Sequence, residues 1–105
     1  MNRGNLFDSI PDDLPDEVFT VLAEGQGARI ERILSHGQAS PASGWYDQAQ
    51  DEWVMVLKGA ARLAFEQGGE TGLGPGDHIL IPARCRHRVT WTDPATVTVW
   101  LAVFF

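Results

Sequence analysis

The sequence of 105 residues predicts an all-β protein, folded as one closed or nearly closed double sheet. Apolar residues follow a period of two from about residue 28 onward, which places them on one face of each β-strand. Short connections rich in turn residues separate these runs, and the chain holds 11 Gly and 6 Pro. Antiparallel strands joined in this way are typical of barrels and sandwiches, so a helical bundle is disfavoured. The length and the 44% hydrophobic content suffice for one core.

The first 27 residues are expected to form an N-terminal segment that carries one helical signal. Four apolar residues recur there at helical spacing: Leu14, Val18, Val21 and Leu22. Pro15 suits the first turn of a helix, and Gly25 and Gly27 can end one. We therefore predict a short helix over residues 15–22, ahead of a barrel over residues 28–105.

Eight strands are expected in the barrel. They cover residues 28–35, 44–48, 52–58, 60–66, 70–73, 77–82, 86–92 and 96–104. The clearest turn lies over residues 74–77, where Pro75 presets the first dihedral and Gly76 accepts a positive φ, as a type II turn requires. Pro82 then ends a strand, because proline cannot donate a hydrogen bond to a neighbouring strand.

Five residues stand at spacings that match a known pair of motifs: Glu52, Gly59, Gly76, Pro82 and His87. The pattern resembles that of the cupin superfamily. The first motif of that family ends in Glu, six residues and Gly, and the second runs Gly, five residues, Pro-x-Gly, two residues and His. The resemblance covers about residues 28–104 and implies a jelly-roll β-barrel.

The chain departs from the family pattern at the residues that carry chemistry. A cupin with complete motifs holds a divalent metal by three His and one Glu, often for oxygen or isomerase chemistry. Here the two histidines of the first motif fall on Tyr46 and Gln48 or on Trp45 and Asp47, depending on which family spacing is used. The metal function therefore does not follow from the resemblance alone.

Glu52 and His87 remain as candidate metal ligands. If the apolar faces of their strands line the barrel, period two turns both side chains inward, and Asp47 or Gln48 adds a third oxygen. Such a set could bind Zn, Ni, Mn or Fe(II), with geometry and availability deciding which. Equally, Glu52 and His87 could hydrogen-bond to each other or to Tyr46 without any metal.

The residues expected to wall a ligand pocket are Trp45, Tyr46, His36 and Trp91. Core packing is the alternative for the aromatic residues, and an exposed turn is the alternative for His36. Arg84 and Trp91 stand where the family pattern has Gly and Asn. The basic run Arg84, Arg86 and Arg88 either binds an anion or forms the solvent side of a strand, paired with acids.

The sequence thus predicts a single-domain protein that binds a divalent metal and a small molecule, such as an organic acid, in the barrel mouth. The reaction, if any, stays unassigned. The alternative is a metal-free small-ligand-binding or interaction module.

The composition restricts the partners and the location. A net charge of −6 and a pI of about 4.8 disfavour nucleic acid and anionic membranes. No apolar run approaches the roughly 18 residues that span a bilayer. The single Cys85 cannot form an internal disulfide and the first residues carry no apolar signal core, so we expect a cytoplasmic protein.

The last strand predicts a homodimer. Val97, Val99, Leu101 and Val103 alternate with Trp100, Ala102 and Phe104, so both of its faces are apolar. One face belongs to the core, and a second subunit packing sheet to sheet would cover the other. The predicted helix over residues 15–22 is the alternative cover.

Overall fold

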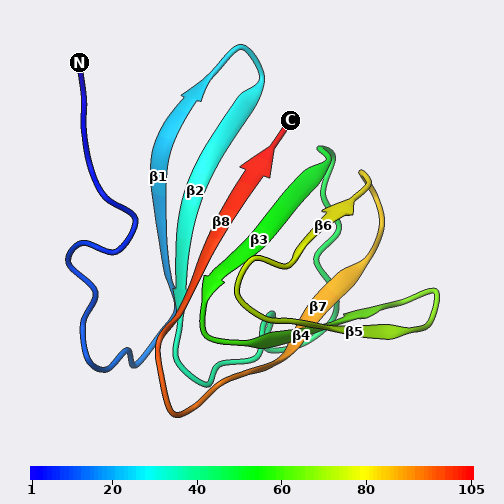
Figure 1. The fold of residues 1–105 in the computed structure, drawn as a ribbon. Coiled ribbons are helices and arrows are strands. Elements are labelled where there is room, and N and C mark those ends of the chain that lie inside the picture. The colour runs from blue at the N-terminus through cyan, green and yellow to red at the C-terminus, as the bar shows by residue number, and fades with distance from the viewer.

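The computed structural model describes all residues 1–105 and contains eight β-strands in two antiparallel sheets (Figure 1). The strands are β1 (Val18–Gly25), β2 (Ala28–Ser35), β3 (Glu52–Lys58), β4 (Ala61–Phe65), β5 (Glu70–Leu73), β6 (His78–Ile81), β7 (His87–Thr92) and β8 (Thr98–Phe104). The larger sheet has the order β1-β2-β8-β3-β6, and the smaller has the order β5-β4-β7. The predicted all-β double sheet is confirmed, and the structure has no helix that could span a membrane.

The core lies between the two sheets, where the inner positions of the strands alternate with outward ones. Val54 and Val56 of β3 are 2% and 0% exposed, and they pack with Leu63 of β4 and Trp100 of β8. Period two therefore identifies the buried face of these strands correctly. β8 lies between β2 and β3, so it is a central strand of its sheet.

The predicted helix over residues 15–22 is wrong, because most of this segment belongs to strand β1. β1 pairs along β2 from Val18 opposite Leu34 to Gly25 opposite Ala28. Gln26 and Gly27 connect the two strands with φ values of 53° and 81°, and two positive φ values suit a tight hairpin whose twist matches that of the strands. The ladder to β2 therefore overrides the helical spacing.

The strand expected over residues 44–48 is reduced to one bridge, in which Tyr46 and His87 exchange backbone hydrogen bonds of 2.8 and 3.2 Å. The turn before β6 forms as predicted. Gly76 has a φ of 87°, and the Asp77 amide donates to the Gly74 carbonyl at 2.9 Å. This turn and the Tyr46 bridge fix the positions of β6 and β7 relative to the loop that carries residues 45–48.

Gly59, between β3 and β4, is required by a close approach of backbone. Its φ is 91°, and a Cβ atom there would lie 2.7 Å from the Cα atom of Thr98. Only glycine fits both constraints, so this motif residue has a structural role.

The N-terminal segment covers one end of the outer face of the larger sheet. Leu14 packs with Leu34, Val97 and Val99, and Ile10 lies against the same cluster. Figure 1 shows this segment running beside β1 before it enters the sheet. The cover proposed for the last strand is thus partly supplied by the N-terminal segment, although as irregular chain with turns and not as a helix.

Candidate functional site

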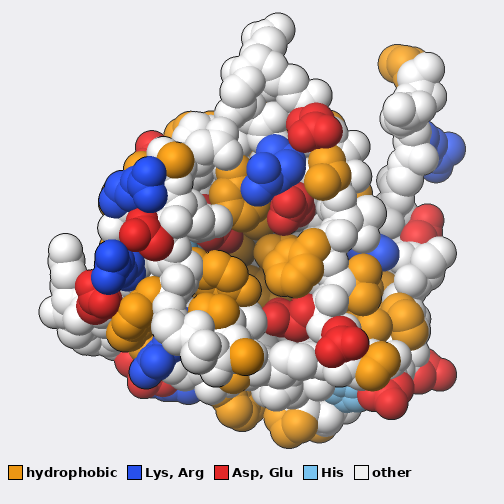
Figure 2. Space-filling view, turned by 180° about the vertical axis from the view of Figure 1, so that it is seen from behind, with side chains coloured by type: hydrophobic (Ala, Val, Ile, Leu, Met, Phe, Trp, Pro, Cys, Tyr) orange, Lys and Arg blue, Asp and Glu red, His pale blue; other side chains and the backbone are white.

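A cavity of about 170 Å³ opens between the two sheets, at the end of the barrel where β3 and β7 begin. The space-filling view shows a hollow near the centre of one face, with hydrophobic side chains inside it and acidic side chains around it (Figure 2). Sixteen residues line the cavity: Glu17, Phe19, Arg29, Glu31, Ile33, Ser40, Tyr46, Gln48, Glu52, Val54, Leu63, Ile81, His87, Val89, Trp100 and Phe104.

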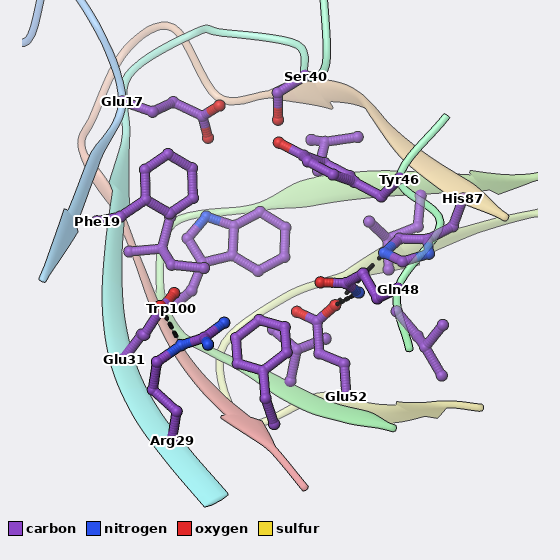
Figure 3. A pocket seen from close by; sticks show the side chains of 16 residues that line it. Glu17, Phe19, Arg29, Glu31, Ser40, Tyr46, Gln48, Glu52, His87 and Trp100 are labelled. Atoms are coloured by element: carbon purple, nitrogen blue, oxygen red, sulfur yellow. Dashed lines mark hydrogen bonds and ion pairs between the residues drawn. The ribbon is translucent and has the colours of Figure 1, made fainter. Parts of the chain in front are cut away.

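Glu52, His87 and Gln48 form a polar cluster on one wall of the cavity (Figure 3). Gln48 Nε2 donates to Glu52 Oε1 at 3.0 Å, and His87 Nε2 lies 3.4 Å from the same oxygen. Glu52 and His87 are 8% and 4% exposed. The first residues of β3 and β7 thus bring together two side chains that are 35 positions apart in the sequence.

The protons of His87 follow from its two neighbours. Its Nδ1 lies 2.9 Å from the Cys85 carbonyl, which only accepts, so Nδ1 carries a hydrogen. Nε2 then faces a carboxylate oxygen and donates to it when the ring is protonated. Burial lowers the pKa of His87, but the hydrogen bond to Glu52, the Cys85 carbonyl and the charge of Glu52 together raise it above 6.5. The pair therefore favours imidazolium beside carboxylate.

Arg29 and Glu31 of β2 form the opposite wall. Arg29 Nε donates to Glu31 Oε2 at 2.7 Å, and the guanidinium lies 4.5 Å from the centre of the Phe104 ring. Glu31 is only 9% exposed. Figure 3 shows the Glu31 carboxylate and the Glu52 carboxylate on different walls of the same cavity.

A third carboxylate, Glu17, lies at the rim beside β1. Ser35 Oγ donates to Glu17 Oε2 at 2.6 Å and accepts from Trp100 Nε1 at 3.1 Å. This relay holds the indole of Trp100 at the inner surface of the cavity (Figure 3). The relay also links the loop before β1 to strands β2 and β8, which carry Ser35 and Trp100.

The Tyr46 phenol points across the cavity toward Glu17 and Ser40 (Figure 3). Burial raises the pKa of Tyr46, Ser40 offsets part of this effect by hydrogen bonding, and the charges of Glu17 and Glu52 raise it further. The phenol therefore keeps its proton and is a hydrogen-bond donor at neutral pH.

Of the eight site residues predicted from the sequence, the structure brings four to the cavity: Glu52, His87, Gln48 and Tyr46. The two family spacings placed the first-motif histidines either at Tyr46 and Gln48 or at Trp45 and Asp47. The structure favours the first pair, because Tyr46 and Gln48 line the cavity. Asp47 is exposed and faces Arg84 and Arg86 at 3.4 and 3.2 Å, so it does not add a ligand beside Glu52. Trp45 stacks under Arg88, with 4.4 Å from Cζ to the ring.

Trp91 and His36 also lie away from the cavity. β7 has one extra residue opposite Arg62 and Leu63, and this bulge turns Trp91 outward, leaving it 42% exposed. His36 follows β2 and places Nδ1 3.2 Å from Asp13 Oδ1. The expectation that these two residues wall the pocket is thus corrected. A bulge within a strand cannot be read from a period of two.

The sequence interpretation missed the wall formed by β1, β2 and β8. Arg29, Glu31 and Ile33 alternate along β2, so their shared face was detectable. The sequence does not show that this face points inward, because two of its three residues, Arg29 and Glu31, are charged. Phe19 was assigned to the predicted helix and was therefore not considered.

The donor set does not fit a resident transition metal. No group of three or more His, Cys, Asp and Glu side chains converges anywhere in the protein. Beside Glu52 and His87, Gln48 offers an amide oxygen, a poor ligand for Zn or Ni, and the Tyr46 phenol is directed toward Ser40 and Glu17. Catalytic zinc sites use three protein ligands of the His, Cys or carboxylate type.

Comparison with known proteins identifies the family. The family model described as Cupin domain matches residues 30–104. The chain belongs to the cupin family. Its eight strands thus form the cupin jelly-roll barrel, as the two motifs indicated. No curated protein matches the sequence.

Three solved structures illustrate the relationship. A proposed mannose-6-phosphate isomerase from Ralstonia eutropha is 51% identical, with a TM-score of 0.94 over 99% of this chain and 97% of its own. A cupin superfamily protein from Desulfitobacterium hafniense is 18% identical, with a TM-score of 0.78 over 100% and 92%. A protein from Thermus thermophilus is also 18% identical, with a TM-score of 0.79 over 99% and 96%. The last two show the fold alone.

Proposed function

We propose that this cupin binds a small molecule in the cavity between its sheets, with Glu52, His87 and Gln48 as the polar anchor. One observation carries the proposal. Glu52 is 8% exposed and engages only its Oε1 with the protein, which leaves Oε2 at the surface of a largely apolar cavity. Because Oε2 is open to the cavity, a ligand that supplies a donor there can form a charge-assisted hydrogen bond with it.

The binding test uses a library of small molecules and a matched pair of variants. Thermal denaturation should reveal compounds that raise the melting temperature of the wild-type protein. Glu52→Gln should abolish that increase. Glu70→Gln should keep it, because Glu70 lies on the exposed side of β5 and does not line the cavity. A library without a single stabilising compound, or an equal response in both variants, would contradict the proposal.

The metal-bound form of the function is the competing hypothesis. Metal analysis of protein grown with Zn, Ni, Mn and Fe supplied should give well under one ion per chain, because Glu52 and His87 lack a third strong ligand. His87→Ala serves as the control, since any ion held in the cavity should be lost with the imidazole. Stoichiometric metal in the wild type that disappears in His87→Ala would overturn the metal-free proposal.

Isomerisation of a sugar phosphate is a second candidate, favoured by the 51% identity to the Ralstonia eutropha protein. Moving a proton between neighbouring carbons is general acid–base chemistry that a carboxylate and an imidazole can perform. The charge of the walls disfavours this substrate, because Glu17, Glu31 and Glu52 would face the phosphate, and the two cations Arg29 and His87 are paired with Glu31 and Glu52. Conversion of mannose 6-phosphate by the wild type, lost in His87→Ala, would establish the activity. Absence of turnover is the expected result.

We also propose that two copies associate through the outer face of the larger sheet. Four apolar residues form one row across it: Ile30, Val103, Trp53 and Leu80. Leu80 is 54% exposed, and the N-terminal segment covers the other end of this face. Light scattering of dilute protein should give about twice the 11.5 kDa of one chain. Leu80→Glu should yield the monomer, and a wild-type monomer at every concentration would refute the homodimer.

A further inference from the structure

We infer that the ligand is a small organic ammonium ion that carries at least one N–H group and an apolar body. The inference rests on the proposed binding function and names the chemical class of the ligand. The formal charge of the lining residues, the unengaged oxygens of two buried carboxylates and the aromatic walls support it independently.

The charge of the walls is negative. Three carboxylates line the cavity, Glu17, Glu31 and Glu52, against the Arg29 guanidinium and the His87 ring, which favours its charged form beside Glu52. Arg29 is paired through Nε with Glu31 and lies over the Phe104 ring, and His87 is paired with Glu52. Each cation is thus paired with one carboxylate, which leaves the charge of Glu17 uncompensated, and an anionic ligand would meet this net negative charge. A cation would relieve repulsion among groups that share one apolar enclosure.

Each of these three carboxylates has an oxygen that accepts no hydrogen bond from the protein, and two of them, Glu31 and Glu52, belong to buried residues. Glu31 uses Oε2 for Arg29, and Glu52 uses Oε1 for Gln48 and His87. Both residues are more than nine-tenths buried, at 9% and 8% exposed. Figure 3 shows both carboxylates at the cavity surface, with the Arg29 guanidinium between them on the side of Glu31. These oxygens are open to the cavity and can each accept a charge-assisted hydrogen bond, and an ammonium group supplies up to three donors.

The remaining walls suit the rest of such a molecule. Phe19, Tyr46, Trp100 and Phe104 present aromatic rings to the cavity. Cations bind to aromatic faces within about 6 Å, and Arg29 over Phe104 at 4.5 Å is one example in this cavity. Because the cavity measures about 170 Å³, below the roughly 300–1,000 Å³ that drug-sized ligands occupy, the ligand is small.

The test uses probes of one skeleton that differ in their polar group: benzylamine, benzyl alcohol, benzoate and benzyltrimethylammonium. NMR titration of the Trp100 indole N–H reports binding, because this group lies in the cavity wall and donates to Ser35. The exposed indole of Trp91 is the reference signal. Benzylamine should bind at least tenfold tighter than benzyl alcohol, and benzoate should not shift the Trp100 signal.

Benzyltrimethylammonium separates charge from hydrogen bonding. It has no N–H group, so it should bind at least threefold more weakly than benzylamine if the free carboxylate oxygens are the receptors. Glu52→Gln should weaken benzylamine binding at least tenfold, whereas Glu70→Gln should leave it unchanged. A melting curve for Glu52→Gln shows that the variant is folded, and a conservative Glu17→Gln variant gives a second test of the charge effect.

The failure of the ammonium inference is distinct from the failure of the binding proposal. Benzyl alcohol or benzoate that shifts Trp100 as strongly as benzylamine does would overturn the cation and keep the binding site. An unchanged Trp100 signal with all four probes would overturn the inference. In that case the compound library would decide separately whether the cavity binds any molecule.

Discussion

The two ends of the barrel are built from the same strands but bury different kinds of side chain. At the end that contains Val56, Ala61 and Leu73, these apolar side chains are 0–6% exposed, and the buried Thr92 and Thr98 are uncharged and donate their hydroxyls to backbone carbonyls. At the other end, Glu52 and His87 are almost as buried, at 8% and 4%, and are polar. Along β3 alone the inner positions change from a carboxylate to two valines within five residues. Burial is thus uniform along the strand, while the chemistry of the buried groups is divided between the ends.

This difference shows where the fold accommodates buried polar groups. A packed apolar end can be stabilised by close contacts alone, whereas each buried polar group at the open end needs a partner. Glu52 and His87 partner each other, and Gln48 donates to the same Glu52 oxygen that faces His87. The stability of the protein should therefore depend on the packed end, and ligand affinity on the open end.

Leu73→Ala should give the largest loss of stability. Leu73 is 6% exposed in the main core, and truncation of a buried leucine costs about 2–5 kcal/mol through lost burial and the cavity left behind. Gln48→Ala should cost less than about 1 kcal/mol, since it removes one partly buried hydrogen bond. Urea unfolding of both variants measures the difference. A comparable loss in the two would remove the distinction between the ends.

The pH dependence of stability should come from the open end. The pKa of His87 is raised in the folded state: burial lowers it, but Glu52 and Cys85 outweigh burial. A raised folded pKa stabilises the protein fully below the unfolded value of about 6.5 and is lost as pH rises through the folded value. The melting temperature should therefore fall from slightly acid to slightly alkaline pH.

Glu52→Gln is the control for this dependence, because it removes the charge that stabilises the imidazolium. The variant should lose stability less steeply than the wild type over the same pH range. Parallel melting curves for the two proteins would show that other groups cause the effect.

The smallest effect on stability should come from a substitution of Arg84, which stands where the family motif has glycine. Its φ is 63°, a left-handed conformation that costs a non-glycine residue about 1 kcal/mol. Arg84→Gly relieves this strain but increases the freedom of the unfolded chain, and the exposed pair with Asp47 contributes little. The unfolding free energy should change by less than about 1 kcal/mol. A much larger loss would assign Arg84 a role in holding residues 45–48 over the cavity.

Part of this arrangement was predictable from the sequence because spacing reports on strands and turns. The positions of Glu52 and His87 relative to Gly59, Gly76 and Pro82 place both at strand starts, and they do meet at 3.4 Å. The turn around Gly76 follows from Pro75. These features depend on local geometry, which neighbouring residues determine.

The rest depends on pairing between distant segments. The helical spacing before Gly25 was overridden by the β2 ladder, and the bulge in β7 reversed Trp91. Glu31 was overlooked because a charged residue on a strand usually faces solvent. Here it faces inward, since the larger sheet extends beyond the three-stranded sheet that covers the core.

The exposed first strand has a consequence for the motions of the protein. All eight residues of β1 are exposed, and β1 hydrogen-bonds only to β2, so its amides should exchange with solvent fastest among the strands. β1 and the residue before it contribute Phe19 and Glu17 to the cavity. Local opening of this strand would widen the entrance without disturbing the core. A molecule that contacts Glu17 and Phe19 would then slow the exchange of β1 selectively, so protection from deuterium exchange would record occupancy.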